Sequence, residues 1–308
     1  MNQFEFRAMN TDIQLFAEGP AEAVETGFSR AKAYIEASEK RFTRFSEDSE
    51  LSQLNALAGT WFEASPELFD VMSQALRLHA LTEGLFDPSI LNALVAAGYD
   101  RSFDEIRTRG AGAATLPVRQ SLHRFGDVRL DSVRRRIWLP PDLRVDLGGI
   151  AKGWIAEHAA QVLAKWSSAC VVNAGGDAFI VGLPAGELFW RMTLEDPLDQ
   201  EKGIAVLKVG PGAVVTSSIT RRRWQQNGQT RHHLIDPRTQ QPAETDWLSV
   251  TVLAGHAAQA EVYAKSLLIG GPQAVERLTR LAGDIEFIAV DYQKKLWGSK
   301  HSPEILDV

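Results

Sequence analysis

The chain has 308 residues, of which 44% are hydrophobic and 23% are charged, and these proportions are those of an ordinary soluble globular protein. This length suffices for one large domain or for two closely associated ones. The net charge of −6 argues against non-specific nucleic-acid binding. The single cysteine, Cys170, excludes an internal disulfide and a multi-cysteine zinc site, and its apolar surroundings in the sequence indicate a core residue.

No stretch of about 18 apolar residues occurs in the sequence, so we expect no membrane span. The chain begins MNQFEF, without a basic start, an apolar run or a small-residue cleavage site. We therefore expect a cytoplasmic protein. The alternative is the mature form of an exported protein from which a leader has been removed.

The first half of the chain predicts a hairpin followed by helices. Alternating and helical spacings of apolar residues predict strands at 4–9, 12–17, 128–130 and 136–139 and helices at 20–44 and 65–84. Ser65 is the expected N-cap of the second helix, with Pro66 at its first position. Residues 100–125 are polar and partly rich in glycine (Arg109-Gly110-Ala111-Gly112), which indicates loops around a short helix.

The second half of the chain is richer in strands. It predicts strands at 143–147, 169–173, 177–182, 188–194, 203–209, 285–290 and 295–297, a further strand ending at 251–254, and helices at 150–165, 257–269 and 272–281. Gly270-Gly271 is expected to stop one of these helices. Because the strands cluster rather than alternate with helices, we expect an α+β fold with mostly antiparallel sheets and packed helices.

The run Asp146-Leu147-Gly148-Gly149-Ile150-Ala151-Lys152-Gly153 joins the strand predicted at 143–147 to a helix. Two glycines allow a close turn, and the N–H groups of a helix start together with a lysine suit a phosphate or pyrophosphate. The alternative is a plain turn with a solvated lysine. The spacing matches neither a Walker loop nor the Gly-x-Gly-x-x-Gly dinucleotide fingerprint.

Further short motifs occur in a fixed order along the chain. They are Met9-Asn10-Thr11, Arg41-Phe42-Thr43-Arg44-Phe45, Ser49 to Asn55, Thr82-Glu83-Gly84-Leu85-Phe86-Asp87-Pro88, Asn173-Ala174-Gly175-Gly176-Asp177, Thr216-Ser217-Ser218 and His232-His233-Leu234-Ile235-Asp236-Pro237-Arg238-Thr239. With the glycine-rich run, they resemble the ApbE family of flavin transferases from about Phe4 to about Gly270. Ser218 replaces a glycine of the family pattern.

The resemblance implies a single ApbE-like, T-fold-like domain over residues 1–308, with two interleaved lobes and flavin dinucleotide in the cleft between them. It implies transfer of FMN from FAD to a Ser or Thr hydroxyl of a flavin-accepting redox protein. A phosphoester bond forms and AMP leaves. The alternatives are a non-catalytic FAD-binding protein that has lost its metal site, and an FAD pyrophosphatase in which water replaces the protein hydroxyl.

The resemblance also assigns site residues. His233 is the implied general base, and the alternative is a packing histidine; His232 is interpreted as structural. The implied FAD contacts are Met9, Phe86, Asp87, Asp146, Gly148, Gly149, Lys152, Thr216, Ser217, Ile235 and Asp236, and Lys265 is added to them because its charge could face the pyrophosphate. For Met9 the alternative is a core role, and for Asp87 and Asp236 it is turn chemistry. One of Arg221, Arg222 and Arg223 is expected to face the site unless the three form a solvated basic turn.

One departure from the family pattern concerns metal binding. The family places an aspartate and, four residues later, a threonine on a helix, where both bind Mg²⁺. This chain has Glu261 and Lys265 at those positions. A lysine repels a nearby divalent ion, so a magnesium site is in doubt, although Glu261 alone could hold a hydrated Mg²⁺. The other interpretations are a fixed ammonium in place of the metal, or an exposed i, i+4 ion pair.

Overall fold

The computed structural model describes residues 1–108, 121–226 and 228–306. These residues form two compact units, each built from separate segments of the chain. Unit 1 contains Met1–Ser38, Lys152–Arg221 and Thr245–Val308. Unit 2 contains Glu39–Ala151 and Arg222–Glu244. The chain therefore passes repeatedly between the two units, as the interleaved lobes of the predicted fold require.

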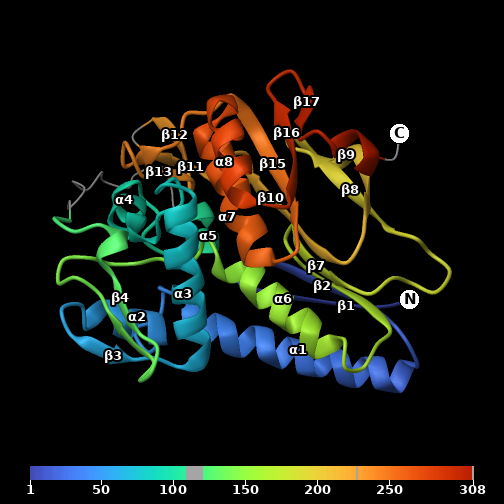
Figure 1. Cartoon of the computed structure of the whole chain (residues 1–308), viewed down its shortest axis with the longest axis horizontal. Coiled ribbons are helices and arrows are strands. Elements are labelled where there is room, and N and C mark those ends of the chain that lie inside the picture. The colour runs from blue at the N-terminus through green and yellow to red at the C-terminus, as the bar shows by residue number, and fades with distance from the viewer. Residues whose placement is uncertain (109–120, 227, 307–308) are drawn as a thin grey trace. The chain divides into compact units, whose positions relative to one another are not determined.

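Unit 1 is organised around an antiparallel sheet with the strand order β1-β2-β6-β7-β10-β15-β16-β17 (Figure 1). Its strands are β1 (Asn2–Ala8), β2 (Thr11–Glu18), β6 (Ala169–Ala174), β7 (Asp177–Val181), β10 (Gly212–Ser218), β15 (Trp247–Ala254), β16 (Ile285–Asp291) and β17 (Leu296–Gly298). The two strands at the start of the chain pair through a turn at Met9 and Asn10. The predicted hairpin at 4–17 is therefore confirmed.

The two faces of this sheet are covered differently. The remaining elements of unit 1 are α6 (Ala151–Leu163), β8 (Trp190–Asp196), β9 (Asp199–Val209), α7 (Ala257–Gly270), η3 (Pro272–Ala274), α8 (Val275–Ala282), α9 (Ser302–Ile305) and most of α1 (Ala21–Phe42). Cys170 on β6 points to the helical face, where its Sγ lies 3.6 Å from the Ala160 carbonyl oxygen of α6. Val171, one residue later, packs with Leu194 and Leu207 of the β8–β9 hairpin on the opposite face.

Cys170 is fully buried, as predicted, and burial raises the pKa of its thiol. A residue in the middle of a sheet covered on both faces has no access to water. This explains why β6 reads as a continuous apolar run rather than an alternating one.

Unit 2 combines short helices with small antiparallel sheets. Its elements are α2 (Glu50–Ala56), β3 (Trp61–Glu63), α3 (Pro66–Leu81), η1 (Pro88–Ile90), α4 (Leu91–Ala96), α5 (Phe103–Thr108), η2 (Phe125–Asp127), β4 (Arg129–Asp131), β5 (Arg136–Trp138), β11 (Arg223–Gln226), β12 (Gln229–His232), β13 (Ile235–Asp236) and β14 (Gln241–Pro242). Ser65 caps α3 by accepting from the Leu68 N–H, with Pro66 at the first helical position, as predicted. One cluster of its core contains Leu94, Tyr99 and Trp224.

The strand predicted at 143–147 is wrong. The segment has alternating burial, but among the described residues no strand pairs with it. Instead, the side-chain amide of Asn55 donates to the Val145 carbonyl and its oxygen accepts the Val145 N–H, both at 2.8 Å. One asparagine side chain thus takes the place of a neighbouring strand, so an extended segment exists without a sheet.

Several elements of the structure were not predicted from the sequence, and the helix predicted at 272–281 differs from the observed one at its start. The strands β10, β11 and β12 were not predicted, because their hydroxyl-rich and arginine-rich sequences resemble loops. The helix predicted at 272–281 begins with a 3₁₀ turn, and the short α9 follows it later in the chain. The short helix expected within 100–125 is α5, whereas Arg109–Gly112 lies outside the described residues. Within the described chain, no helix is both long and apolar enough to cross a membrane.

Candidate functional site

Lys152 is not a solvated lysine. Its Nζ lies 2.6 Å from Oδ2 of Asp177 and 3.1 Å from the carbonyl oxygen of Ala174, and its side chain is 19% exposed. Both partners flank the Gly175–Gly176 turn between β6 and β7. The first turn of α6 is therefore tied by a largely buried ion pair to the Asn173–Asp177 motif.

The next residue of α6 connects this helix to α7. The N–H of Gly153 donates to Oε2 of Glu261 at 2.8 Å, and Oε1 of the same carboxylate accepts from Nζ of Lys265 at 2.7 Å. The Glu261 side chain is fully buried and that of Lys265 is 15% exposed. The interpretation of this pair as an exposed surface ion pair is therefore wrong.

Gly153 is required by this packing. A Cβ at this position would lie 2.7 Å from the Ala257 carbonyl oxygen and 3.1 Å from Oε2 of Glu261. Any larger residue would push α6 away from the start of α7 and lengthen the hydrogen bond to Glu261. The last glycine of the Asp-Leu-Gly-Gly-Ile-Ala-Lys-Gly run therefore has a packing reason that is independent of a ligand.

The start of α6 is less open to an anion than the sequence indicates. The N–H groups of Ile150 and Ala151 donate to the Leu147 carbonyl at 3.0 and 2.8 Å, and that of Gly153 is taken by Glu261. Free N–H groups are what make a helix start a phosphate site. The positive groups that this region offers are therefore chiefly the ammonium groups of Lys152 and Lys265.

The Met9-Asn10-Thr11 motif forms the turn between β1 and β2. Met9 and Asn10 have φ angles of 53° and 54°, as a type I′ turn requires, and this backbone is uncommon for a methionine. Thr11 packs against Gly175, where a Cβ would fall 1.9 Å from the Thr11 Oγ1. The Met9 turn and the Gly175–Gly176 turn are therefore neighbours in unit 1.

Thr216 and Ser217 point to opposite faces of the sheet. Alternation along β10 places Thr216 with Val214 on the face of the β8–β9 hairpin, where its Oγ1 lies 2.8 Å from that of Thr251. Ser217 is buried on the face that α7 covers. The two hydroxyls therefore cannot contact the same phosphate group, although the sequence places them side by side.

Asp146 in unit 2 holds the glycine turn that follows it. Its Oδ1 accepts the Gly148 N–H at 2.8 Å, and its Oδ2 lies 2.7 Å from Nε of Arg44. The ion pair is buried, with side chains 7% and 14% exposed, and Arg44 also donates to the Tyr99 carbonyl at 2.8 Å. Gly149 completes the turn. The carboxylate of Asp146 thus has structural partners on both oxygens.

Phe86 and Asp87 end the segment after α3. Phe86 is buried, and its carbonyl accepts from the His79 ring at 2.8 Å. Asp87 caps η1, because its Oδ1 accepts from the N–H and the hydroxyl of Ser89 at 2.7 and 2.6 Å. The local geometry of Asp87 is thus that of the turn residue named as its alternative.

The two adjacent histidines have different surroundings. His232 is the last residue of β12, and its Nε2 donates to the Ala243 carbonyl at 3.0 Å. Burial lowers the pKa of its imidazole. His233 follows the strand and is partly exposed. Both histidines are therefore partly exposed, and His232 is the one whose Nε2 is held by the Ala243 carbonyl within unit 2.

Ile235 and Asp236 form β13 directly after the histidines. Ile235 is buried in the core of unit 2, so any contact with a ligand would come from its main chain. Both oxygens of Asp236 accept from the Arg238 guanidinium, and Oδ1 also accepts the Arg238 N–H at 2.8 Å. This bidentate pair raises the pKa of Arg238 and closes the Asp-Pro-Arg turn.

Comparison with known proteins assigns the chain to a family. The model of the ApbE family matches residues 9–289, which is most of the chain. The chain belongs to the ApbE family. An FAD:protein FMN transferase of Klebsiella pneumoniae is 27% identical over 271 residues, which cover 86% of this chain and 76% of that protein. One of Treponema pallidum is 27% identical over 293 residues, which cover 91% and 79%.

Solved structures agree with this assignment at the level of the fold. The ApbE protein of Thermotoga maritima superimposes with a TM-score of 0.83 at 22% identity, over 99% of this chain and 98% of that one. The flavin transferase ApbE of Vibrio cholerae gives 0.78 at 23% identity, over 99% of each chain. The α+β fold with mostly antiparallel sheets, expected from the sequence, is therefore confirmed.

The residues of this ApbE chain do not fit the family's magnesium site. At the two positions that the resemblance assigns to metal ligands, Glu261 has both oxygens engaged and Lys265 presents an ammonium group. The described part of the chain contains no cluster of His, Cys, Asp or Glu side chains that could hold a metal ion. A cation entering here would have to displace the Lys265 ammonium or the Gly153 N–H from a buried carboxylate.

Two residues with structural roles near the motifs were not singled out from the sequence. Arg44 pairs with Asp146, and Asn55 holds the main chain of Val145. Both belong to motifs that were quoted for the family resemblance, but their partners are about 90 to 100 residues away in the chain. An arginine followed by a distant acid carries no periodic signal, so sequence spacing alone does not reveal such pairs.

Proposed function

We propose that this chain transfers the FMN portion of FAD to a Ser or Thr hydroxyl of a flavin-accepting redox protein. The acceptor oxygen attacks the phosphorus of the FMN phosphate, the bond to the bridging oxygen breaks, and AMP leaves with that oxygen. The hydroxyl proton passes to a base. Such a reaction needs the pyrophosphate to be held and its developing charge to be neutralised.

The observation that carries this proposal is the linkage of two ammonium groups at the start of α6. Lys152 is fixed by Asp177 and Ala174, and the adjacent Gly153 is joined through Glu261 to Lys265. Each ammonium group is paired with a buried carboxylate, so it would act on a phosphate as a pre-positioned N–H donor rather than as an isolated charge. Pre-positioned lysines also need little reorganisation during the reaction.

His233 is our candidate for the base that accepts the hydroxyl proton. A neutral imidazole suits this role near neutral pH. The adjacent His232 is a poorer candidate, because its Nε2 is hydrogen-bonded to the Ala243 carbonyl. The family resemblance at 232–239 and the partial exposure of His233 support the assignment.

Lys265 takes the place of a bound metal ion in this proposal. The buried carboxylate of Glu261 orients the ammonium, and no protonation change or ion uptake is needed to supply the positive charge. FAD binding and transfer should therefore depend little on added Mg²⁺. The contacts of Glu261 with Gly153 and Lys265 support this view. Positions 261 and 265 are those of the family's metal ligands, and these contacts occupy both oxygens of the one carboxylate found there.

Incubation of the purified protein with FAD tests the proposal. FAD should bind saturably, with a dissociation constant of about 1 μM or lower, which corresponds to about −8 kcal/mol. With an acceptor flavoprotein, FMN should appear covalently on the acceptor together with AMP. Free FMN and AMP without an acceptor would indicate a pyrophosphatase, and binding without turnover would indicate a non-catalytic protein. Failure to bind FAD would contradict all three.

A further inference from the structure

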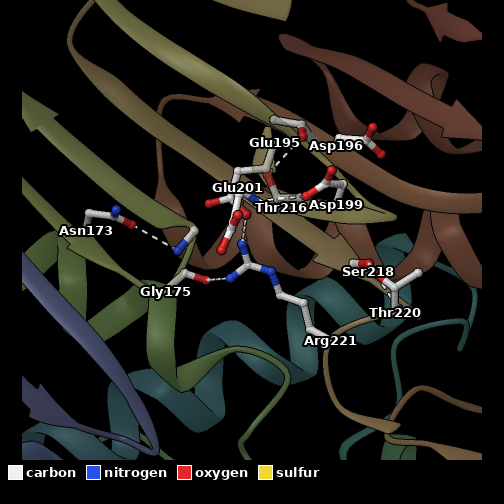
Figure 2. A network of polar contacts seen from close by, with 12 residues as sticks. Asn173, Gly175, Glu195, Asp196, Asp199, Glu201, Thr216, Ser218, Thr220 and Arg221 are labelled. Atoms are coloured by element: carbon white, nitrogen blue, oxygen red, sulfur yellow. Dashed lines mark hydrogen bonds and ion pairs between the residues drawn. The ribbon is translucent and has the colours of Figure 1, made fainter. Parts of the chain in front are cut away.

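A small pocket with both apolar and polar side chains lies in unit 1 on the face of the sheet that the β8–β9 hairpin covers. It has a volume of about 90 Å³, and Asn173, Thr216, Ser218 and Thr251 contribute polar side chains to its lining. Figure 2 shows Asn173, Thr216 and Ser218 with the carboxylates of the hairpin around Arg221. A hydroxyl group donates one hydrogen bond and accepts two, so hydroxyls that are paired with each other keep capacity for a ligand.

Arg221 reaches across the edge of this pocket. Its Nη1 donates to the Gly175 carbonyl at 3.3 Å, and its Nη2 forms an ion pair with the carboxylate of Glu195 on β8 (Figure 2). Arg222 and Arg223 belong to unit 2, and Arg223 is exposed on β11. Arg221 therefore joins the Asn173–Asp177 motif to β8 through these two contacts.

The Arg221–Glu195 pair is suited to exchange. The two side chains are 38% and 47% exposed, and ion pairs at such exposure contribute little net free energy. A guanidinium has five N–H donors in a planar fork, which matches the oxygens of a carboxylate or phosphate. A substrate oxyanion can therefore replace Glu195 at small cost and gain the charge-assisted hydrogen bonds of Arg221.

Two neighbouring carboxylates, those of Asp196 and Asp199, form ion pairs with lysines. Asp196 pairs with Lys294 at 2.5 Å and also accepts the Leu198 N–H, and Lys294 lowers the pKa of this acid. Asp199 pairs with Lys202 at 2.6 Å. Glu195 is the carboxylate that forms an ion pair with Arg221, while Asp199 offers a matched control on the same hairpin.

We propose that this pocket, the Arg221 pocket, receives an oxyanion of a substrate and that Glu195 occupies Arg221 until the oxyanion displaces it. The proposal rests on the proposed function for the identity of the two substrates. The oxyanion belongs either to a phosphate of the dinucleotide or to a carboxylate of the acceptor protein. In both cases Arg221 supplies the hydrogen bonds that determine the affinity for the oxyanion. Glu195 lowers this affinity, because it competes with the oxyanion for Arg221.

The first test uses inorganic phosphate as the probe, so that it does not depend on transfer activity. Phosphate binding is measured by calorimetric titration for the wild type, Arg221→Ala, Arg221→Lys, Glu195→Gln and Asp199→Asn, with chloride held at equal ionic strength. Arg221→Ala should weaken binding about 10- to 100-fold, the range for losing a hydrogen bond to a charged group. Glu195→Gln should strengthen it by up to about five-fold, since it removes an exposed competitor. Asp199→Asn should have no effect.

The second test identifies the source of the oxyanion. If the dinucleotide supplies it, the same variants should shift the dissociation constant of FAD in those opposite directions. If the acceptor supplies it, the FAD constant should stay unchanged and the KM for the acceptor should move. Equal effects of Arg221→Ala and Glu195→Gln, or no effect of either, would overturn the proposal, because a purely structural ion pair is lost equally from both ends. A wild type that binds FAD but transfers no flavin would instead refute the proposed function.

Discussion

The Lys265 ammonium lies 2.7 Å from Oε1 of Glu261, and the carboxylate it contacts is fully buried within the helical layer of unit 1. Removing the lysine should leave this carboxylate charged without its partner. Lys265→Ala is therefore expected to lower the free energy of unfolding by about 3–5 kcal/mol, the usual cost of breaking a buried pair. Chemical denaturation measures the change.

The chain provides a matched control for this prediction. Lys32 and Glu36 form an i, i+4 pair on α1 at 3.6 Å, with side chains 41% and 47% exposed. Lys32→Ala should cost no more than a few tenths of a kcal/mol. Similar losses for the two variants would mean that the Glu261 pair behaves as a surface pair.

Rebuilding the family's metal ligands should create metal dependence. The double variant Glu261→Asp with Lys265→Thr removes the ammonium and offers a carboxylate and a hydroxyl to a divalent ion. We expect this variant to bind Mn²⁺ in an electron paramagnetic resonance titration. The unmodified protein should bind FAD and transfer flavin as well in EDTA as it does with added Mg²⁺. Strong stimulation of the unmodified protein by Mg²⁺ would show that Lys265 does not replace the ion.

Replacement of His233 should separate catalysis from binding. His233→Ala is expected to leave the FAD dissociation constant nearly unchanged and to lower the rate of transfer by about 10²–10⁴-fold, the usual contribution of a general base. The rate is measured as FMN incorporated into the acceptor per unit time. Wild-type transfer by His233→Ala would place the base on another residue.

Gly153→Ala should destabilise the contact between α6 and α7. The added Cβ would lie 2.7 Å from the Ala257 carbonyl oxygen, and relief requires the helices to separate. We expect a loss of about 1–3 kcal/mol, as for other overpacked positions. Gly255→Ala is the control, because nothing lies within 4 Å of a Cβ built there. Equal melting temperatures for the two variants would show that the helices can adjust freely.

His232 should make stability depend on pH. Burial lowers the pKa of its imidazole below the ordinary 6.5, Arg223 adds to this effect, and the hydrogen bond to Ala243 opposes it. The unfolded chain therefore binds the proton more readily, so this contribution to stability is complete above pH 6.5 and is lost as the pH falls through the folded-state pKa.

The non-titrating variant His232→Gln can still donate to the Ala243 carbonyl. Between about pH 7 and pH 5, its melting temperature should therefore fall less than that of the wild type. Parallel melting curves across this range would mean that the His232 imidazole has the same pKa in the folded and unfolded chain.

Local signals in the sequence predicted most of the long elements. The hairpin at 4–17, the helices α1, α3, α6 and α7, and the paired strands β8 and β9 all follow from apolar spacing and from the Ser65–Pro66 cap. These features depend on residues a few positions apart, where periodicity and capping act directly. The Leu143–Leu147 segment has the same alternation as a strand, and it failed as a prediction because strand pairing needs a partner that the segment itself does not specify.

The order of short motifs determined the family, and the substitutions at Glu261 and Lys265 already placed a magnesium site in doubt from the sequence alone. Only the tertiary structure decided that this pair is buried, that Thr216 and Ser217 face opposite sides of a sheet, and that Arg221 contacts both Gly175 and Glu195. Burial, face and long-range pairing are set by segments far apart in the chain. They determine what a charged or hydroxyl group can do, because the strength of a charge and the reach of a side chain depend on what surrounds them.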